Sequence, residues 1–217
     1  MNRTLFIGDV HGCIEELKEL LIKASYDSQS DRLIYLGDIL NKGPKSAEVL
    51  RFVRAQKVEC ILGNNEVGFL DLVKNGGYQG SSIYNVIDDL GDDLDDYCQW
   101  IESFPTYIEE DDFIAVHAGI DPSKTVSESS IRVRTTIRTW DGKGANLNNH
   151  SDPNWYELYN GKKTIIYGHY AADGLQVRDK TIGLDSGCVF GGELSCLVWP
   201  TREVIQVKAK KKYLKVS

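Results

Sequence analysis

The chain of 217 residues is long enough to bury a substantial core, and its hydrophobic content of 41% and charged content of 26% are ordinary for a globular protein. Its formal net charge of -7 argues against a protein that holds a nucleic-acid backbone by bulk electrostatics. No apolar stretch is long enough to span a bilayer and the first residues fit no signal peptide, so we expect a cytoplasmic protein with neither a membrane nor a nucleic acid as partner.

The first half of the sequence alternates short apolar runs with amphipathic segments. The apolar runs end in Gly-Asp or Gly-Asn, and they predict strands over residues 4–7, 32–36 and 58–62. Apolar residues at helical spacing predict helices over residues 15–24, 44–53 and around 69–73. Pro44 is expected at the first position of its helix. Residues 76–96 are rich in glycine, serine and aspartate, which predicts surface loops with one short helix.

The second half carries mainly strand-like runs. They predict strands over residues 113–116, 164–167, 182–184, 194–199 and 204–207. The sequence contains no internal repeat and no linker-like segment, which indicates a single domain over residues 1–217. Helices in the first half and strands in the second favour an α/β fold in which two packed β-sheets are flanked by helices.

The cysteines and the basic C-terminus indicate no chemistry of their own. The five cysteines include no CxxC pair, which is typical of reduced thiols in a cytosolic protein. Cys13 lies near the first motif, and we interpret it as a small buried residue at the start of a helix rather than a nucleophile. A solvated last strand and tail accounts better than a nucleic-acid arm for the basic residues Lys208, Lys210, Lys211, Lys212 and Lys215.

Polar residues that can bind metals stand where five of the predicted strands end. They are Asp9 with His11, Asp38, Asn64, His117 and His169. Strand ends in α/β folds face a common crevice, so these residues can meet although they are far apart in sequence. Each one alone is more easily explained as a helix cap or a buried histidine. Their joint occurrence favours a site. His150 lacks this context, and we interpret it as a surface residue.

Carboxylates combined with imidazoles suit divalent manganese, iron or zinc, and manganese is our first expectation. Two such ions carry four positive charges. Two aspartates and a bridging hydroxide cancel three of them, while Asn64 and the histidines are neutral donors. The remaining positive charge favours a phosphate group, and metal ions supply hydroxide near neutral pH.

These residues stand in blocks that resemble the metallophosphoesterase superfamily, in its phosphoprotein-phosphatase and diadenosine-tetraphosphatase branch. The matching blocks are Gly-Asp-Val-His-Gly at 8–12, Gly-Asp to Gly-Pro at 37–44, Gly-Asn-Asn-Glu at 63–66, His-Ala-Gly-Ile at 117–120 and Gly-His at 168–169. Residues 184–197 resemble the closing strands of the tetraphosphatases. The resemblance implies a sandwich of two mixed β-sheets flanked by helices.

The resemblance also implies a set of metal ligands. One ion would be held by Asp9, His11 and Asp38, and the other by Asp38, Asn64, His117 and His169. Phosphate would be contacted by Asn64, Lys42 and Arg138. Arg134 is a rival of Arg138, and Glu66 is expected behind the ligands.

Two blocks depart from the family pattern. The position of the family's general-acid histidine holds Asn65, which cannot supply a proton at neutral pH. An Asp or small residue followed by Arg is usual in the second block, and here the pair is Asn41-Lys42. Lys42 keeps the charge without the bidentate fork, and Asn41 cannot orient a histidine as an aspartate does. We expect alkyl esters to be hydrolysed slowly, and anhydrides and aryl esters less so, because their leaving groups need less protonation.

The first hypothesis is a phosphatase acting on phosphomonoesters, either phosphorylated small molecules or phosphoproteins, by attack of a metal-bridging hydroxide. Asn65, Asp38, Arg138 and Lys42 are its catalytic candidates. The second hypothesis is a symmetrical dinucleoside polyphosphate hydrolase. The third is a non-catalytic phosphate-binding protein, which Asn65 favours and the complete ligand set opposes.

Overall fold

The computed structural model describes residues 3–77 and 81–214, and it contains two sheets of five strands each. The first sheet has the order β10-β9-β1-β2-β3 and the second β4-β5-β6-β8-β7. The strands of the first sheet are β1 (Thr4–Ile7), β2 (Arg32–Tyr35), β3 (Glu59–Cys60), β9 (Glu193–Trp199) and β10 (Glu203–Lys208). Those of the second are β4 (Tyr107–Glu109), β5 (Phe113–Val116), β6 (Thr164–Tyr167), β7 (Gln176–Val177) and β8 (Thr181–Gly183). Both sheets mix parallel and antiparallel pairs.

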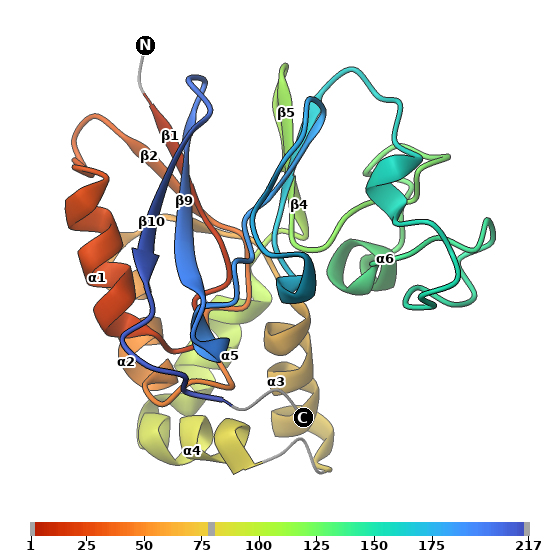
Figure 1. The fold of residues 1–217 in the computed structure, drawn as a ribbon. Coiled ribbons are helices and arrows are strands. Elements are labelled where there is room, and N and C mark those ends of the chain that lie inside the picture. Colours follow the sequence, from red (N-terminus) through yellow and green to blue (C-terminus); the bar gives the residue numbers. More distant parts are fainter. Residues whose placement is uncertain (1–2, 78–80, 215–217) are drawn as a thin grey trace.

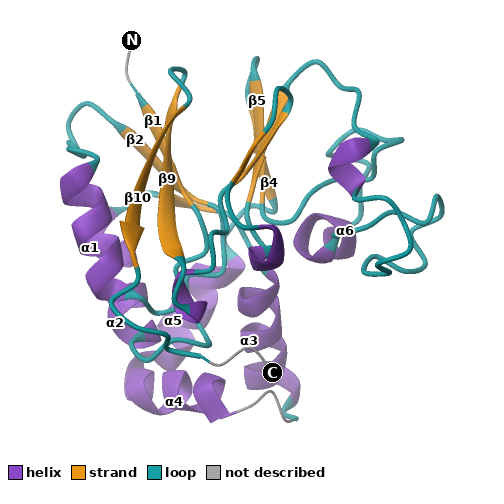
Figure 2. Cartoon of the chain, viewed as in Figure 1, coloured by secondary structure: helices purple, strands orange, loops and turns teal. Residues whose placement is uncertain are grey.

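Helices cover the outer face of the first sheet, while loops and α6 cover that of the second (Figures 1 and 2). The helices are α1 (Ile14–Lys23), α2 (Ser46–Gln56), α3 (Asn64–Asn75), α4 (Ser81–Leu90), α5 (Leu94–Glu102) and α6 (Ile131–Thr136). The predicted fold class, two packed mixed sheets flanked by helices, is confirmed.

Strand β1 illustrates why the core strands read as continuous apolar runs. All four of its residues are buried. Phe6 packs into the cluster between the two sheets, whereas Leu5 and Ile7 pack against the helices. A strand that is covered on both faces needs apolar side chains at every position rather than at alternate ones.

The structure corrects three details of the predicted helices and strands. Helix α2 begins at Ser46, so Pro44 precedes the helix, because Lys45 still has a non-helical backbone. Within residues 76–96, which include the undescribed 78–80, α4 accounts for the one short helix that was predicted, and the start of α5 lies where a loop was predicted. Buried Ile83, Val86 and Leu90 give α4 its apolar face. Strands β4 and β7 were not predicted, because runs of three and two residues carry no readable period.

The basic C-terminal tail follows β10. Lys208 ends β10, and Lys210, Lys211 and Lys212 lie in the tail that follows, as predicted, while Lys215 lies outside the described residues. All five cysteines are free thiols. Among the described residues, no helix combines the length and the apolarity that a membrane crossing requires.

Candidate metal centre and phosphate pocket

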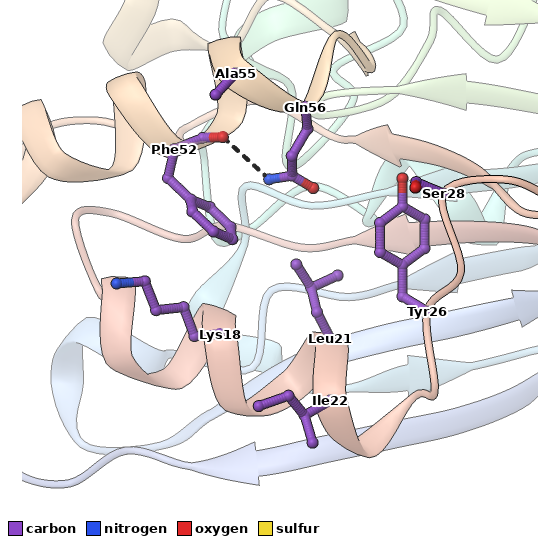
Figure 3. A pocket seen from close by; sticks show the side chains of 8 residues that line it. All are labelled: Lys18, Leu21, Ile22, Tyr26, Ser28, Phe52, Ala55 and Gln56. Atoms are coloured by element: carbon purple, nitrogen blue, oxygen red, sulfur yellow. Dashed lines mark hydrogen bonds between the residues drawn. The ribbon is translucent and has the colours of Figure 1, made fainter.

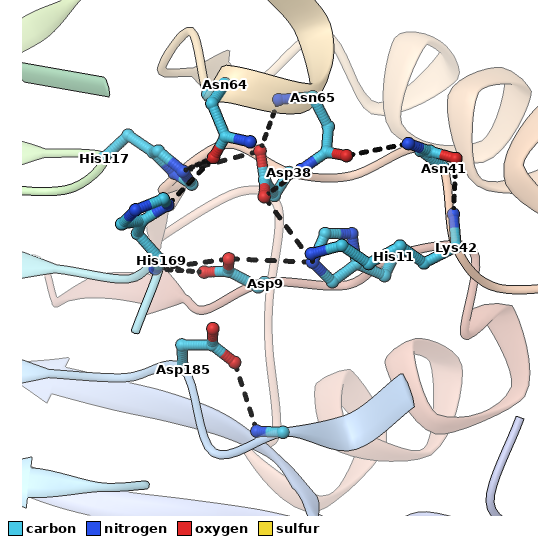
Figure 4. Close-up of polar contacts among 12 residues, drawn as sticks. Asp9, His11, Asp38, Asn41, Lys42, Asn64, Asn65, His117, His169 and Asp185 are labelled. Carbon is cyan, nitrogen blue, oxygen red and sulfur yellow. Dashed lines mark hydrogen bonds and ion pairs between the residues drawn. The ribbon is translucent and has the colours of Figure 1, made fainter. Parts of the chain in front are cut away.

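The loops after β1 and β2 bring together the first three predicted ligands (Figure 4). The Nε2 atom of His11 lies 3.9 Å from Oδ2 of Asp9 and 3.5 Å from Oδ2 of Asp38. All three side chains are buried. This group could therefore hold a cation away from bulk water.

Asp38 also faces the second group of predicted ligands. Its Oδ1 atom lies 3.4 Å from Nε2 of His117. The Oδ1 atom of Asn64 lies 3.0 Å from the same nitrogen of His117 and 2.8 Å from Nδ1 of His169 (Figure 4). The structure thus brings all six residues to one place, with Asp38 between the two groups, as a shared ligand would have to be.

Glycines beside the candidate ligands make this close approach possible. A Cβ atom on Gly168 would lie 2.1 Å from Oδ1 of Asp9, and one on Gly63 would lie 2.4 Å from Oδ1 of Asp38. His11 and Asp38 have φ angles of 45° and 50°, which non-glycine residues rarely adopt. Such backbone strain concentrates at functional sites, where the surrounding structure holds it in place.

The imidazoles of the site are neutral. Burial, reinforced by the positive charge of Lys42, lowers the pKa of His11 to about 4. Burial likewise lowers the pKa values of His117 and His169. Burial opposes the ionisation of Asp38, but His117, His11 and Lys42 bring its pKa below the usual range. Neutral imidazole and ionised carboxylate are the forms that bind metal ions.

The residues present fit a site for cations. Burial raises the pKa of Asp9 well above normal, and the charges of Asp185 and Asp38 add to the effect, so three carboxyl groups crowd together without enough positive charge. The buried Nε2 atom of His169 has no hydrogen-bond partner among the residues that the structure describes. The Lys42 ammonium lies 2.8 Å from Nε2 of His11, which places a positive charge against a candidate ligand atom. Divalent ions would neutralise the excess negative charge of these carboxyl groups.

Asp185 is a site residue that the sequence analysis did not single out. It lies in the loop after β8, is 5% exposed, and has a pKa raised to about 6 by burial. Figure 4 places it beside Asp9. The same rule that found the other residues could have found it, because it directly follows the predicted strand over 182–184.

Asn65 lies inside the site and is held by its neighbours. Its backbone N–H donates to Oδ1 of Asp38 at 2.9 Å, and its side-chain amide donates to Oδ2. Its own Oδ1 accepts a hydrogen bond of 2.8 Å from Nδ2 of Asn41. The two departures from the family pattern are therefore in direct contact, and neither side chain can supply a proton.

The side chain of Glu66 connects the loop after β2 with the residue that precedes α3. Its carboxylate accepts hydrogen bonds from the N–H groups of Asp38 at 2.8 Å, Ile39 at 2.9 Å and Gly63 at 3.0 Å. It is fully buried, and burial together with the charge of Asp38 raises its pKa to about 8. Glu66 therefore positions Asp38 relative to α3. It lies behind the candidate ligands, as expected from the sequence.

A pocket of about 680 Å³ opens beside the candidate metal ligands. The residues around its mouth that could contact a substrate are Lys42, Arg138, His150, Tyr170 and Phe190. The Arg138 guanidinium lies 5.2 Å from the centre of the Tyr170 ring, and its buried Nε atom has no hydrogen-bond partner within the described part of the chain. His150 is exposed, as predicted, but it lines this pocket, a position that its sequence context did not indicate.

The structure distinguishes Arg138 from Arg134, the two arginines that the sequence offers as phosphate-binding residues. Arg134 donates a hydrogen bond of 2.9 Å to the carbonyl of Val126 and lies over the Tyr107 ring. It is 9% exposed and does not line the pocket. Arg134 therefore holds its own loop together, and Arg138 is the arginine available to a phosphate.

Another pocket, of about 600 Å³, lies between α1 and α2 (Figure 3). Its lining combines apolar side chains such as Leu21 and Phe52 with Lys18 and Gln56. None of the candidate metal-binding groups found among the described residues lies there. It offers no comparable chemistry.

The chain matches the calcineurin-like phosphoesterase family over residues 2–203. A relative from Vibrio parahaemolyticus, named symmetrical bis(5'-nucleosyl)-tetraphosphatase, is 26% identical and the match covers 93% of this chain and 97% of the relative. A relative of the same name from Janthinobacterium is 28% identical over 94% of this chain and 96% of its own. The alignment with the Vibrio protein spans 259 residues against the 217 of this chain, so that relative carries insertions.

The fold of this chain is also similar to those of solved structures. One described as a candidate diadenosine tetraphosphatase is 31% identical, with a TM-score of 0.86 over 96% of this chain and 94% of its own. A cold-active protein-tyrosine phosphatase of a Shewanella species shares the fold at 21% identity, with a TM-score of 0.59 over 97% of this chain and 81% of its own.

Proposed function

Because the chain belongs to the calcineurin-like phosphoesterase family and is a metal-dependent hydrolase, we propose that it splits dinucleoside tetraphosphates symmetrically into two nucleoside diphosphates. This places the second hypothesis of the sequence analysis ahead of the first. The relatives named for this reaction align with nearly the whole chain, whereas the likeness to the Shewanella phosphatase concerns the fold alone.

The observation that carries the proposal is the composition of the pocket beside the ligand cluster. Tyr170 and Phe190 offer ring faces on which a nucleoside base can stack. Lys42 and Arg138 offer positive charge in the same pocket, and Lys42 lies 5.8 Å from the centre of the Phe190 ring. A polyphosphate chain attached to a base needs this combination of cations and aromatic rings.

The proposed roles follow from position. Asp9, His11 and Asp38 would hold one divalent ion, and Asp38, Asn64, His117 and His169 the other. We add Asp185 as a residue that orients the first group. Two ions, with manganese as first expectation, would polarise the phosphate and activate water. Arg138 and Lys42 would bind the phosphate oxygens, and the Arg138 fork would fix their orientation.

The absence of a histidine at position 65 agrees with an anhydride substrate. Asn65 can hold Asp38 in place and donate a hydrogen bond, but it cannot protonate a leaving group. A nucleoside diphosphate leaves as a stabilised anion and needs little protonation, whereas an alkoxide needs much more. The site therefore favours cleavage between phosphates over cleavage of an alkyl ester.

The test is hydrolysis of diadenosine tetraphosphate with manganese, with the products separated by ion-exchange chromatography. We expect ADP alone. Equal amounts of ATP and AMP would reject the symmetrical reaction. The matched control is p-nitrophenyl phosphate under the same conditions, and fast cleavage of that ester without any ADP from the dinucleotide would restore the phosphomonoesterase hypothesis.

A further inference from the structure

A second group of potential metal ligands lies outside the site already described. Cys13 stands at the N-terminus of α1, Glu16 in the first turn of α1, and Cys188 in the short helix after β8. Their ligand atoms all lie within 4.8 Å of one another, and the three residues are 2%, 0% and 2% exposed. Cys13 and Glu16 lie together at the start of α1, whereas Cys188 lies far along the sequence, so only folding brings the third residue to the other two.

Glu16 is the informative member of this group. Its Oε1 atom accepts hydrogen bonds from the backbone of Lys210 at 2.9 Å and from the Tyr213 hydroxyl at 2.7 Å. Its Oε2 atom is buried and has no hydrogen-bond partner among residues 3–77 and 81–214. A buried carboxylate oxygen without a hydrogen bond is costly, and the cost is relieved when the oxygen binds a cation. The two thiols beside it are the natural further ligands of such a cation.

The donor set identifies the kind of ion. Two cysteine sulfurs with one carboxylate oxygen suit zinc, whereas manganese and magnesium prefer sites built of oxygen and nitrogen. We propose that Cys13, Cys188 and Glu16 bind one zinc ion, separate from the two-metal centre, with water as its fourth ligand.

The surroundings of Cys13 and Glu16 would admit an ion, and nearby lysines would balance the charge of the occupied site. A pocket of about 410 Å³ is lined by two of the three residues, Cys13 and Glu16, together with Lys210 and Tyr213, so an ion would enter on the side of Cys13 and Glu16. Two thiolates and a carboxylate carry three negative charges against the two positive charges of zinc. The excess negative charge would face Lys210 and Lys211, which line the same pocket. Tyr213 would orient the Glu16 carboxylate through its other oxygen.

The ion would join three segments behind the catalytic loops. Cys13 follows Asp9 and His11 in one loop, and Cys188 follows Asp185 in another. The tail is tied to the second loop, because the N–H groups of Tyr213 and Leu214 each donate to the Val189 carbonyl at 3.0 Å. Zinc would therefore stabilise both loops and the tail without touching substrate.

Cadmium titration of the manganese-saturated protein tests the proposal, because cadmium–thiolate bonds absorb in the ultraviolet and the two-metal centre contains no sulfur. We expect one equivalent of cadmium to produce the band in the unmodified chain. Cys188→Ser should abolish it or shift it to much higher cadmium concentration. The matched control is Cys60→Ser, which removes a buried thiol of β3 and should leave the band unchanged.

Glu16→Gln provides a readout that is independent of thiol loss. Its amide oxygen can still accept from Lys210 and Tyr213, so the fold should persist, while cadmium affinity should fall by about tenfold or more. Zinc should raise the melting temperature of the unmodified chain more than that of this variant. A folded, reduced protein without the band would overturn the proposal, as would a band that survives in Cys188→Ser. Loss of two thiols on mild peroxide treatment, with no cadmium band when reduced, would assign the pair to disulfide chemistry instead.

Discussion

The two sides of the phosphate site are built differently. The floor consists of the six candidate metal ligands Asp9, His11, Asp38, Asn64, His117 and His169, with Asp185 beside them; these residues follow the central parallel strands of the two sheets or, for Asn64, begin α3. The pocket wall consists of Lys42, Arg138, His150, Tyr170 and Phe190, which come from loops. Most of the floor is buried and its atoms contact one another, whereas the wall is half-buried or exposed and contains two cations, Lys42 and Arg138.

This difference assigns the chemical reaction to the floor and the choice of substrate to the wall. The floor is fixed by rigid strand ends and carries the groups proposed to hold the metal ions, which hydrolysis of any substrate would need. The wall is carried by loops, which can vary without disturbing the sheets, so it can determine which phosphate compound is accepted. Changes in the floor should affect all substrates, and changes in the wall should discriminate between them.

Asp38→Asn should have the largest effect. Asp38 lies between both candidate metal groups, so its loss should weaken both ions and lower activity by roughly 10³-fold or more, the rate equivalent of the several kcal/mol that a metal ion supplies. Metal analysis of the dialysed protein and the rate on diadenosine tetraphosphate check this. Retention of two manganese ions at normal affinity would mean that the ligand assignment is wrong.

The pair Asn41→Asp with Asn65→His should increase activity on alkyl phosphates by about 10²-fold, because it restores a general acid together with its orienting carboxylate. The existing contact between the two asparagines makes the pair the unit to test. Asn65→His alone should gain less, roughly tenfold, and the anhydride should change little. An equal gain on the alkyl ester and the anhydride would contradict the leaving-group argument.

Arg138→Ala should raise KM for diadenosine tetraphosphate by about ten- to a hundredfold, since a hydrogen bond to a charged group contributes about 1.5–3 kcal/mol. The rate at saturation should change less. Arg134→Ala is the matched control. It removes a structural contact to the Val126 carbonyl, so it should lower the melting temperature and leave KM unchanged. The reverse pattern would exchange the two roles.

Tyr170→Ala should have the smallest effect and the most selective one. Loss of one stacking surface at a half-exposed position should cost about 1 kcal/mol, or about fivefold in KM for diadenosine tetraphosphate. Inorganic tripolyphosphate, which has no base, should show no change in KM. If both substrates are weakened equally, Tyr170 acts by supporting Arg138 rather than by contacting a nucleoside.

The sequence predicted the floor better than the wall for a physical reason. A ligand that follows an apolar strand carries two local signals, the buried run and the polar residue that ends it. Six of the seven floor residues were found by that rule, and Asp185 meets it as well. Tyr170 and Phe190 carry no local signal, because a half-buried aromatic residue in a loop looks the same whether it faces a pocket or packs against the surface.

By itself, the sequence determined the fold class, the short buried strands and the polar residues that follow them, because strand periodicity and ligand chemistry are local properties of the chain. Only the tertiary structure decided that Arg138 rather than Arg134 faces the pocket, that Asn41 contacts Asn65, and that Cys13, Glu16 and Cys188 meet. These are contacts between residues distant in the sequence or choices of side-chain direction. They depend on how the sheets and loops pack, which no local pattern records.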